Sequence, residues 1–132
     1  VEWVERRGGV AVPAHPYQAG MVGNAMGDRV LQLKGLVAVE TLNGSLRPEL
    51  NQMAQEAARR LGVRGIGGSD AHGILALGKA YTCFSTAITG EAHLVALLRG
   101  GEYAARQENR KEDAQAVAGN QDAAFRENEA SP

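Results

Sequence analysis

Short apolar runs, separated by amphipathic segments, constrain the fold of this chain more than any other feature. Three of them cover residues 10–14, 36–39 and 63–67. Each is too short for a typical helix and shows little alternation, which is characteristic of strands buried on both faces. A fourth run, residues 80–84, is rich in strand-forming residues and predicts another strand.

The segments between these runs carry helical patterns. A first helix is predicted where four apolar residues share one face, namely Val22, Met26, Val30 and Leu33. The clearest helix has Pro48 near its start, an apolar stripe through its middle and Gly62 at its end. A last helix is predicted with Thr89 as its N-cap, closed by Gly100 and Gly101.

Strands that alternate with helices indicate an α/β fold, with a parallel sheet or a βα barrel. The 132-residue length suits one domain or a piece of a larger one. Residues 106–132 differ, because Glu, Gln, Asn, Ala and Arg dominate them and large apolar side chains are few. We therefore predict two parts: an α/β unit over residues 1–105, and a polar tail, mobile or a frayed helix, over residues 106–132.

Charge and cysteine content narrow the class of protein. The formal net charge is −1, which argues against a global basic surface for nucleic acid. Cys83 is the single cysteine, so no internal disulfide forms and a reducing, cytoplasmic location is expected. Within its apolar run, Cys83 is predicted to be a small core residue. No apolar run approaches the ~18 residues of a membrane span, so no membrane partner is expected.

Polar side chains follow three of the predicted strands. His15 follows the first, Glu40 the second, and Asp70 with His72 the third. Ligands of parallel α/β proteins bind at the carboxyl ends of strands, so these side chains are predicted to converge. A carboxylate and an imidazole two residues apart can reach one cation, and such donors suit zinc, manganese or iron.

Each of these residues also has a simpler interpretation. Asp70 can cap a turn beside an exposed His72, and His15 alone is more often packed or exposed than a ligand. Glu40 can bind substrate, orient another group or pair with an arginine. Asn43 can contact a phosphate or form a local Asx turn.

Taken in order, four segments resemble one family. They are Gly-Val-Ala-Val-Pro-Ala-His-Pro (9–16), Val-Ala-Val-Glu with Asn-Gly (37–44), Gly-Ser-Asp-Ala-His (68–72) and Leu-Gly-Lys-Ala-Tyr-Thr (77–82). The series resembles the C-terminal half of polymerase-and-histidinol-phosphatase (PHP) phosphoesterases, over roughly residues 1–103. The resemblance implies the C-terminal βα units of a distorted βα barrel, with divalent metals at the strand ends.

The same resemblance implies roles for individual residues. His15, Asp70 and His72 match metal ligands of the family, with zinc, manganese or iron as the implied ion. Glu40 and Asn43 match recurrent family positions and are candidate substrate-binding residues. The implied reaction is hydrolysis of a phosphate ester, such as a nucleoside phosphate or a short oligonucleotide, by metal-activated water.

The chain also departs from the family. The opening H-x-H motif and the ligands between it and His15 have no counterpart. We therefore expect the C-terminal half of a longer protein, weak or inactive alone, which self-associates or pairs with an N-terminal half. The alternative is a truncated, non-catalytic module for binding or oligomerisation. A related metal-dependent amidohydrolase would need a bridging lysine or further histidines, and neither is evident.

Overall fold

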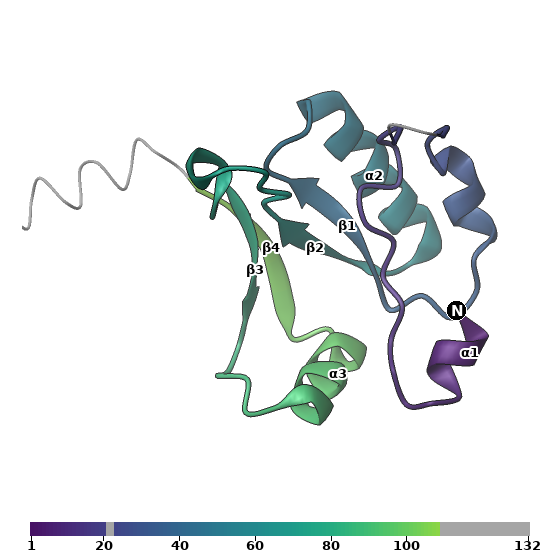
Figure 1. The fold of residues 1–132 in the computed structure, drawn as a ribbon. Coiled ribbons are helices and arrows are strands. Elements are labelled where there is room, and N and C mark those ends of the chain that lie inside the picture. The colour runs from purple at the N-terminus through teal and green to yellow at the C-terminus, as the bar shows by residue number, and fades with distance from the viewer. Residues whose placement is uncertain (21–22, 109–132) are drawn as a thin grey trace, which may run out of the picture.

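The computed structural model describes residues 1–20 and 23–108 (Figure 1). Short 3-10 helices are labelled η. In chain order the elements are α1 (Glu2–Glu5), η1 (Gly27–Gln32), β1 (Ala38–Asn43), α2 (Pro48–Leu61), β2 (Arg64–Gly68), η2 (Ile74–Ala76), β3 (Ala80–Phe84), α3 (Glu91–Gly100) and β4 (Tyr103–Gln107). No helix within these described ranges has the length and apolar character that a membrane crossing needs.

The centre of the fold is a β1–α2–β2 unit whose two strands are parallel. Pro48 occupies the start of α2, where its missing N–H leaves no helical bond unmade. Gly62 ends α2 in the left-handed conformation at φ 68°, which glycine adopts without steric cost. The predicted boundaries of this helix are therefore confirmed.

Strand β1 extends further than its apolar run predicted. The apolar run ends at Val39, but β1 continues to Asn43, with an irregularity in its register between Glu40 and Leu42. Thr41 and Asn43 are buried polar residues, which the hydrophobic pattern does not mark as strand. A Cβ on Gly65 would collide with the Thr41 side chain, so β2 needs glycine opposite this part of β1.

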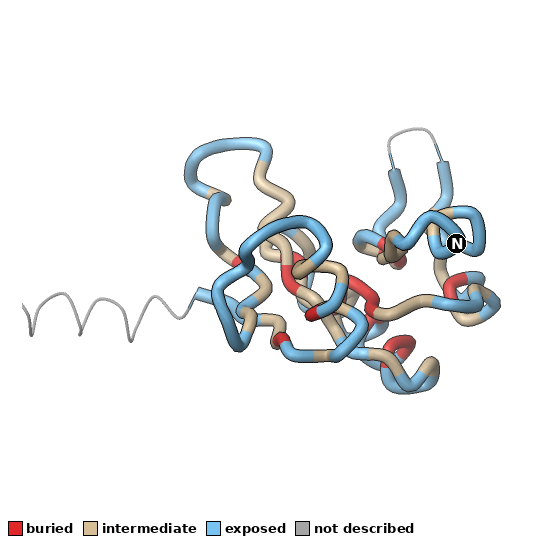
Figure 2. Tube along the Cα trace, turned by 90° about the horizontal axis from the view of Figure 1, so that it is seen from below, coloured by how far each residue is buried: buried red, intermediate tan, exposed pale blue. Residues whose placement is uncertain are grey.

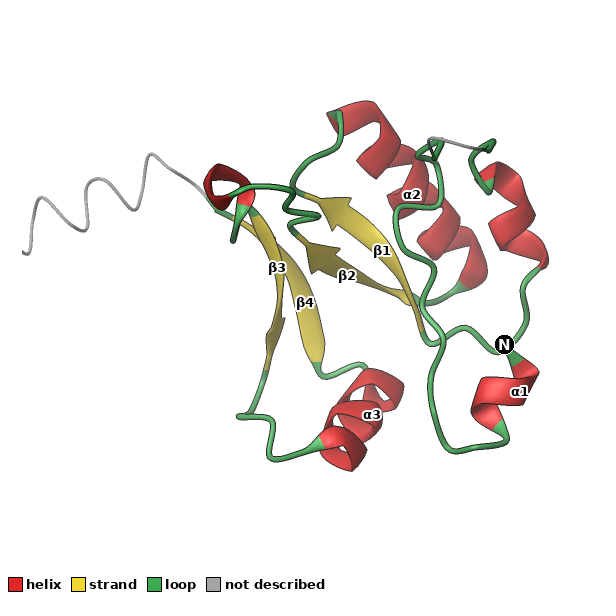
Figure 3. Ribbon diagram, viewed as in Figure 1, coloured by secondary structure: helices red, strands yellow, loops and turns green. Residues whose placement is uncertain are grey.

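The second sheet corrects the predicted architecture. β3 pairs with β4 in antiparallel fashion, and the pair lies beside β2 (Figure 3). The described residues form a mixed α/β structure with two small sheets and no closed barrel, and only β1 and β2 satisfy the parallel prediction. Arg106 and Gln107, which the prediction assigned to the tail, belong to β4, and residues 109–132 lie outside the described part.

The beginning of the chain also differs from prediction. The apolar run at residues 10–14 forms no regular strand. It nevertheless runs beside β1, where the N–H of Glu40 donates to the carbonyl of Pro13 at 3.0 Å. Pro13 has no N–H to return, which limits a continuous ladder here. The first predicted helix is reduced to the 3-10 helix η1, with Val30 buried, and Val22 lies outside the described residues.

The core is small, and most of the trace in Figure 2 is exposed or partly exposed. Its fully packed cluster joins η1, β1 and α2 through Val30, Val39, Ala57 and Ala58. Cys83 is exposed, contrary to its predicted core position. In β3 the residues 80, 82 and 84 are more buried than 81 and 83, so strand alternation puts Cys83 on the open face.

The N-cap of the last helix lies one residue after the predicted cap. Gly90, not Thr89, is the N-cap of α3. Thr89 instead approaches His93, whose Nδ1 accepts from the Thr89 N–H at 3.3 Å and lies 3.1 Å from its hydroxyl. Gly101 ends α3 at φ 72°, as predicted from the glycine pair.

Candidate functional site

The candidate site lies where β1 and β2 end. These parallel strands finish together, with Asn43 opposite Gly68 (Figure 1). The loop of Asp70 and His72 follows β2 directly, and the segment that carries His15 passes along β1. Glu40 of β1 is hydrogen-bonded to the segment that carries His15, and Ser45, just after β1, is hydrogen-bonded to the loop of Asp70.

His15 is bound to Glu40 through its backbone. Its N–H donates to Oε2 of Glu40 at 2.6 Å, although the two residues are 25 positions apart. The Glu40 residue is only 8% exposed. A hydrogen bond to a carboxylate is stronger than one between neutral groups, especially where water is excluded. Glu40 therefore fixes where the chain turns after the first apolar run.

The same carboxylate contacts β1 and β2. Its Oε2 also accepts from Nδ2 of Asn43 at 3.3 Å. A Cβ placed on Gly68 would lie 2.5 Å from Oε1 of Glu40. Gly68 thus leaves the space that this carboxylate fills. Glu40 thus makes contacts that orient other groups, which is one of the roles that its place in the sequence left open.

Asn43 supports the end of β1. Its Oδ1 accepts from the N–H of Ser45 at 2.9 Å, which is the Asx turn considered from the sequence. Its backbone N–H and carbonyl are both bonded to the side-chain amide of Asn51, each at 3.0 Å. Asn43 is therefore a structural residue of this turn.

Asp70 and His72 form the exposed part of the site. Nδ1 of His72 lies 2.9 Å from the carbonyl oxygen of Asp70 and 3.9 Å from its Oδ1. A carbonyl oxygen only accepts, so Nδ1 carries the proton in this contact. The other ring nitrogen, Nε2, then keeps its lone pair in the neutral ring, which is the usual arrangement of a metal-ligating histidine.

Ser45 joins the Asp70 loop to β1. Its hydroxyl lies 2.7 Å from the carbonyl of Ser69 and 3.0 Å from that of Asp70. Sequence reasoning missed the supporting roles of Ser45 and Asn51. The Asn-Gly-Ser turn could have suggested Ser45 as a turn residue, but no spacing pattern identifies its partners in the loop after β2.

Backbone conformation marks two of the predicted ligands. Among the described residues, His15 at φ 28° and Asp70 at φ 49° are the only non-glycine residues with positive φ. This region disfavours residues that have a Cβ, and such residues concentrate at functional sites. Both positions are held by hydrogen bonds from β1 or its following turn.

The described residues do not by themselves complete a metal site. Within that part of the chain, no group of three His, Cys, Asp or Glu side chains could hold one ion. Asp70 and His72 supply two suitable donors, a carboxylate and an available imidazole nitrogen. The donor chemistry fits part of a site, and the remaining ligands are not gathered around it here.

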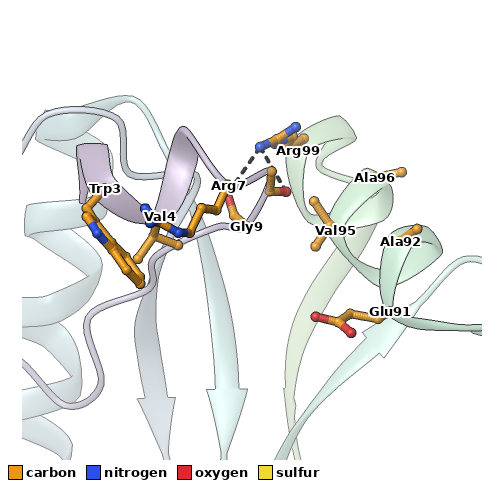
Figure 4. A pocket seen from close by; sticks show the side chains of 10 residues that line it. Trp3, Val4, Arg7, Gly9, Glu91, Ala92, Val95, Ala96 and Arg99 are labelled. Carbon is orange, nitrogen blue, oxygen red and sulfur yellow. Dashed lines mark hydrogen bonds between the residues drawn. The ribbon is translucent and has the colours of Figure 1, made fainter.

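A cavity lies away from the strand ends. It has a volume of about 780 Å³ and runs between α1 and α3 (Figure 4). Its walls include Trp3, Val4 and Val95, while Arg99 donates to the carbonyls of Gly8 and Gly9 at 3.3 and 3.1 Å. This cavity does not include the residues predicted for chemistry, so the candidate site remains at the strand ends.

Comparison with known families supports the sequence resemblance. Residues 48–103 match the family model described as PHP-associated. Over these residues the chain is similar to the PHP-associated family. This segment runs from the first residue of α2 to the first residue of β4 and contains Asp70 and His72. His15, Glu40 and Asn43 lie before it. Neither the curated proteins nor the solved structures gave a significant match to this chain.

Proposed function

We propose that the chain contributes part of the site of a metal-dependent phosphoesterase. The observation that carries this proposal is the Asp70–His72 pair, in which the Nδ1 contact leaves Nε2 available as a ligand. The PHP-associated match covers this pair. Zinc, manganese or iron would be held by Asp70 and His72, with further ligands from outside the described residues.

The protein's own groups would perform limited tasks in this reaction. A bound divalent ion would supply positive charge for the phosphate oxygens and lower the pKa of water. Asp70 would contribute negative charge to ion binding, and His72 a neutral nitrogen. Glu40 and Ser45 would hold the surrounding loops and would not touch the phosphate ester.

Two exposed apolar residues near the pair support the substrate class that the family resemblance implies. Ile74 and Leu75 come directly after the loop and are each 82% exposed. An apolar edge beside charged ligands is suited to a substrate with both a phosphate and an apolar ring. A nucleoside phosphate or a short oligonucleotide has this composition.

A second candidate is a non-catalytic binding or oligomerisation module. It is favoured by the absence of a three-donor group among the described residues. The two candidates differ in what Asp70 and His72 bind. A catalytic fragment should hold a divalent ion through this pair, whereas a non-catalytic module should not.

Metal binding followed by an activity assay tests the proposal. The chain and its Asp70→Asn, His72→Gln double variant would be titrated with Zn²⁺ and Mn²⁺ by calorimetry. We expect binding that the double variant loses. Activity on a nucleoside phosphate and a dinucleotide would then be measured with each ion. Equal binding by the chain and the double variant, or none by either, would reject the proposal.

A further inference from the structure

We infer that the cavity between α1 and α3 binds a small organic anion, meaning a carboxylate or a similar group attached to an apolar body. Its volume of about 780 Å³ lies within the range of small-molecule pockets, roughly 300–1,000 Å³. The residues that line it are separate from Asp70 and His72, so this inference does not depend on the proposed function.

One wall of the cavity is a face of α3 on which an apolar residue lies between two charged ones. Glu91, Val95 and Arg99 are spaced four apart, so they share this face. The rise of an α-helix places Glu91 and Arg99 about 12 Å apart along the axis. Val95 lies between them (Figure 4). An anion bound near Arg99 is therefore kept away from the Glu91 carboxylate.

Arg99 also joins the two walls of the cavity. Its Nη2 donates to the carbonyls of Gly8 and Gly9 at 3.3 and 3.1 Å, which ties the segment after α1 to α3. These bonds use the N–H groups of Nη2 alone, so the donors on Nε and Nη1 remain. Both partners are uncharged, and no carboxylate contacts Arg99 within residues 1–20 and 23–108. The positive charge of Arg99 is therefore available to an anion.

Arg7 supplies a second positive charge, from the α1 side of the cavity. Its guanidinium carbon lies 3.9 Å from the centre of the Trp3 ring. In this position the charge interacts with the face of the indole, while the N–H groups at the guanidinium edge stay available for hydrogen bonds. Among the described residues no carboxylate pairs with Arg7. Since Glu91 is the only acidic residue of the described lining, the two arginines give this lining a net positive charge.

Apolar side chains complete the lining. Val4 and Val95 line the cavity from its α1 and α3 sides (Figure 4), and Trp3 is 60% exposed. Covering these side chains removes apolar surface from water, which favours a ligand with a hydrocarbon part. A bare inorganic anion gains only the charge interactions. The lining is therefore complementary to an anion that carries an apolar body.

Fluorescence titration of the full chain tests this inference. Trp3 is the single tryptophan, so its emission reports directly on the cavity that it lines. The probes are phenylbutyrate, phenylbutanol and phenylbutylamine, which share one ring and one chain length but differ in charge. We expect saturable binding of phenylbutyrate, with a Kd at least about tenfold below those of the other two probes and of inorganic phosphate.

Substitution of two neighbouring arginines locates the bound anion. Arg7→Gln removes the charge of an exposed side chain that makes no hydrogen bond among the described residues, so the chain should stay folded. We expect the Kd of phenylbutyrate to rise about tenfold. Arg7→Lys keeps the charge and should recover part of this loss. Arg6→Gln is the matched control, because Arg6 lines a different cavity that also includes Trp3, and it should leave the Kd within about twofold.

The same titrations can overturn the inference. Phenylbutyrate that binds no more tightly than phenylbutanol or phenylbutylamine would show that the cavity does not select an anion. An Arg7→Gln variant within about twofold of the unmodified chain, or an equal loss in Arg6→Gln, would place the anion elsewhere. A lack of any saturable change in Trp3 emission would also overturn the inference, whatever the metal titration of Asp70 and His72 shows.

Discussion

The hydroxyl of Thr82 bonds to both backbone groups of Gly67. It accepts from the Gly67 N–H at 3.0 Å and donates to the Gly67 carbonyl at 2.8 Å. A single side chain on β3 thereby connects the antiparallel sheet to β2. Because Asp70 follows β2 directly, this contact also steadies the strand that leads into the candidate site.

Replacing Thr82 tests that connection. Thr82→Val keeps the side-chain shape but leaves the N–H and carbonyl of Gly67 without this partner. We expect the free energy of unfolding to fall by about 1–3 kcal/mol, measured by urea denaturation. Thr89→Val alters an exposed threonine and should change it by less than ~0.5 kcal/mol. Equal effects of the two variants would contradict the assigned role.

The close approach of β2 to β3 gives a second prediction. A Cβ on Gly67 would meet the Tyr81 carbonyl oxygen, and its carbonyl carbon at 2.9 Å. Backbone atoms cannot rotate away, so Gly67→Ala should destabilise the chain by about 1–3 kcal/mol. Gly73→Ala is the matched control, because a Cβ there meets nothing within 4 Å. Thermal unfolding of the two variants should therefore differ clearly.

Backbone strain at Asp70 gives a third prediction. Asp70→Gly and Asp70→Ala both remove the carboxylate, but only glycine accepts φ 49° freely. Asp70→Gly should thus be the more stable of the two by about 1 kcal/mol in urea denaturation. At Asp28, inside η1, the order should reverse, because glycine costs more than alanine in a helix. If the glycine variant were the more stable one at both positions, the result would argue against backbone strain at Asp70.

The Tyr17 hydroxyl should make the stability of the folded chain depend on pH. Burial, then the hydrogen bond that its hydroxyl donates to Asp28 at 2.8 Å, raises the pKa of Tyr17 from 10.0 to about 12. The folded state then keeps a proton that the unfolded state loses. Its contribution to stability is full below pH 10.0 and is lost as the pH rises towards about 12.

Tyr17→Phe isolates this contribution. The variant should lose less stability than the unmodified chain between pH 10.0 and about 12 in urea denaturation. Subtracting the two curves removes the effect of other groups that titrate in the same range. Parallel curves would show that the Tyr17 hydroxyl has an ordinary pKa.

Several elements could be predicted because their signals are local. The helix that starts at Pro48 and is capped by Gly62 could be predicted because its proline, its stripe of apolar residues and its glycine lie within one segment. The conformation of residues 10–14 could not be predicted correctly. Apolar composition does not show that the regular hydrogen bonds to a neighbouring strand are missing here. β4 was not predicted, and Arg106 and Gln107 were assigned to the tail, because the pairing with Tyr81 and Ala80 that makes them strand joins distant parts of the chain.

In the candidate site too, some features could be predicted from the sequence and others depend on the tertiary structure. The sequence alone predicted His15, Asp70 and His72 as candidate metal donors, because the type of each residue and its place after an apolar run can be seen in the chain. Only the tertiary structure decided that Glu40 faces inward to hold the backbone of His15, and that Ser45 reaches Asp70. Such contacts join residues 25 positions apart, and their partners are set by strand register, which no local pattern encodes.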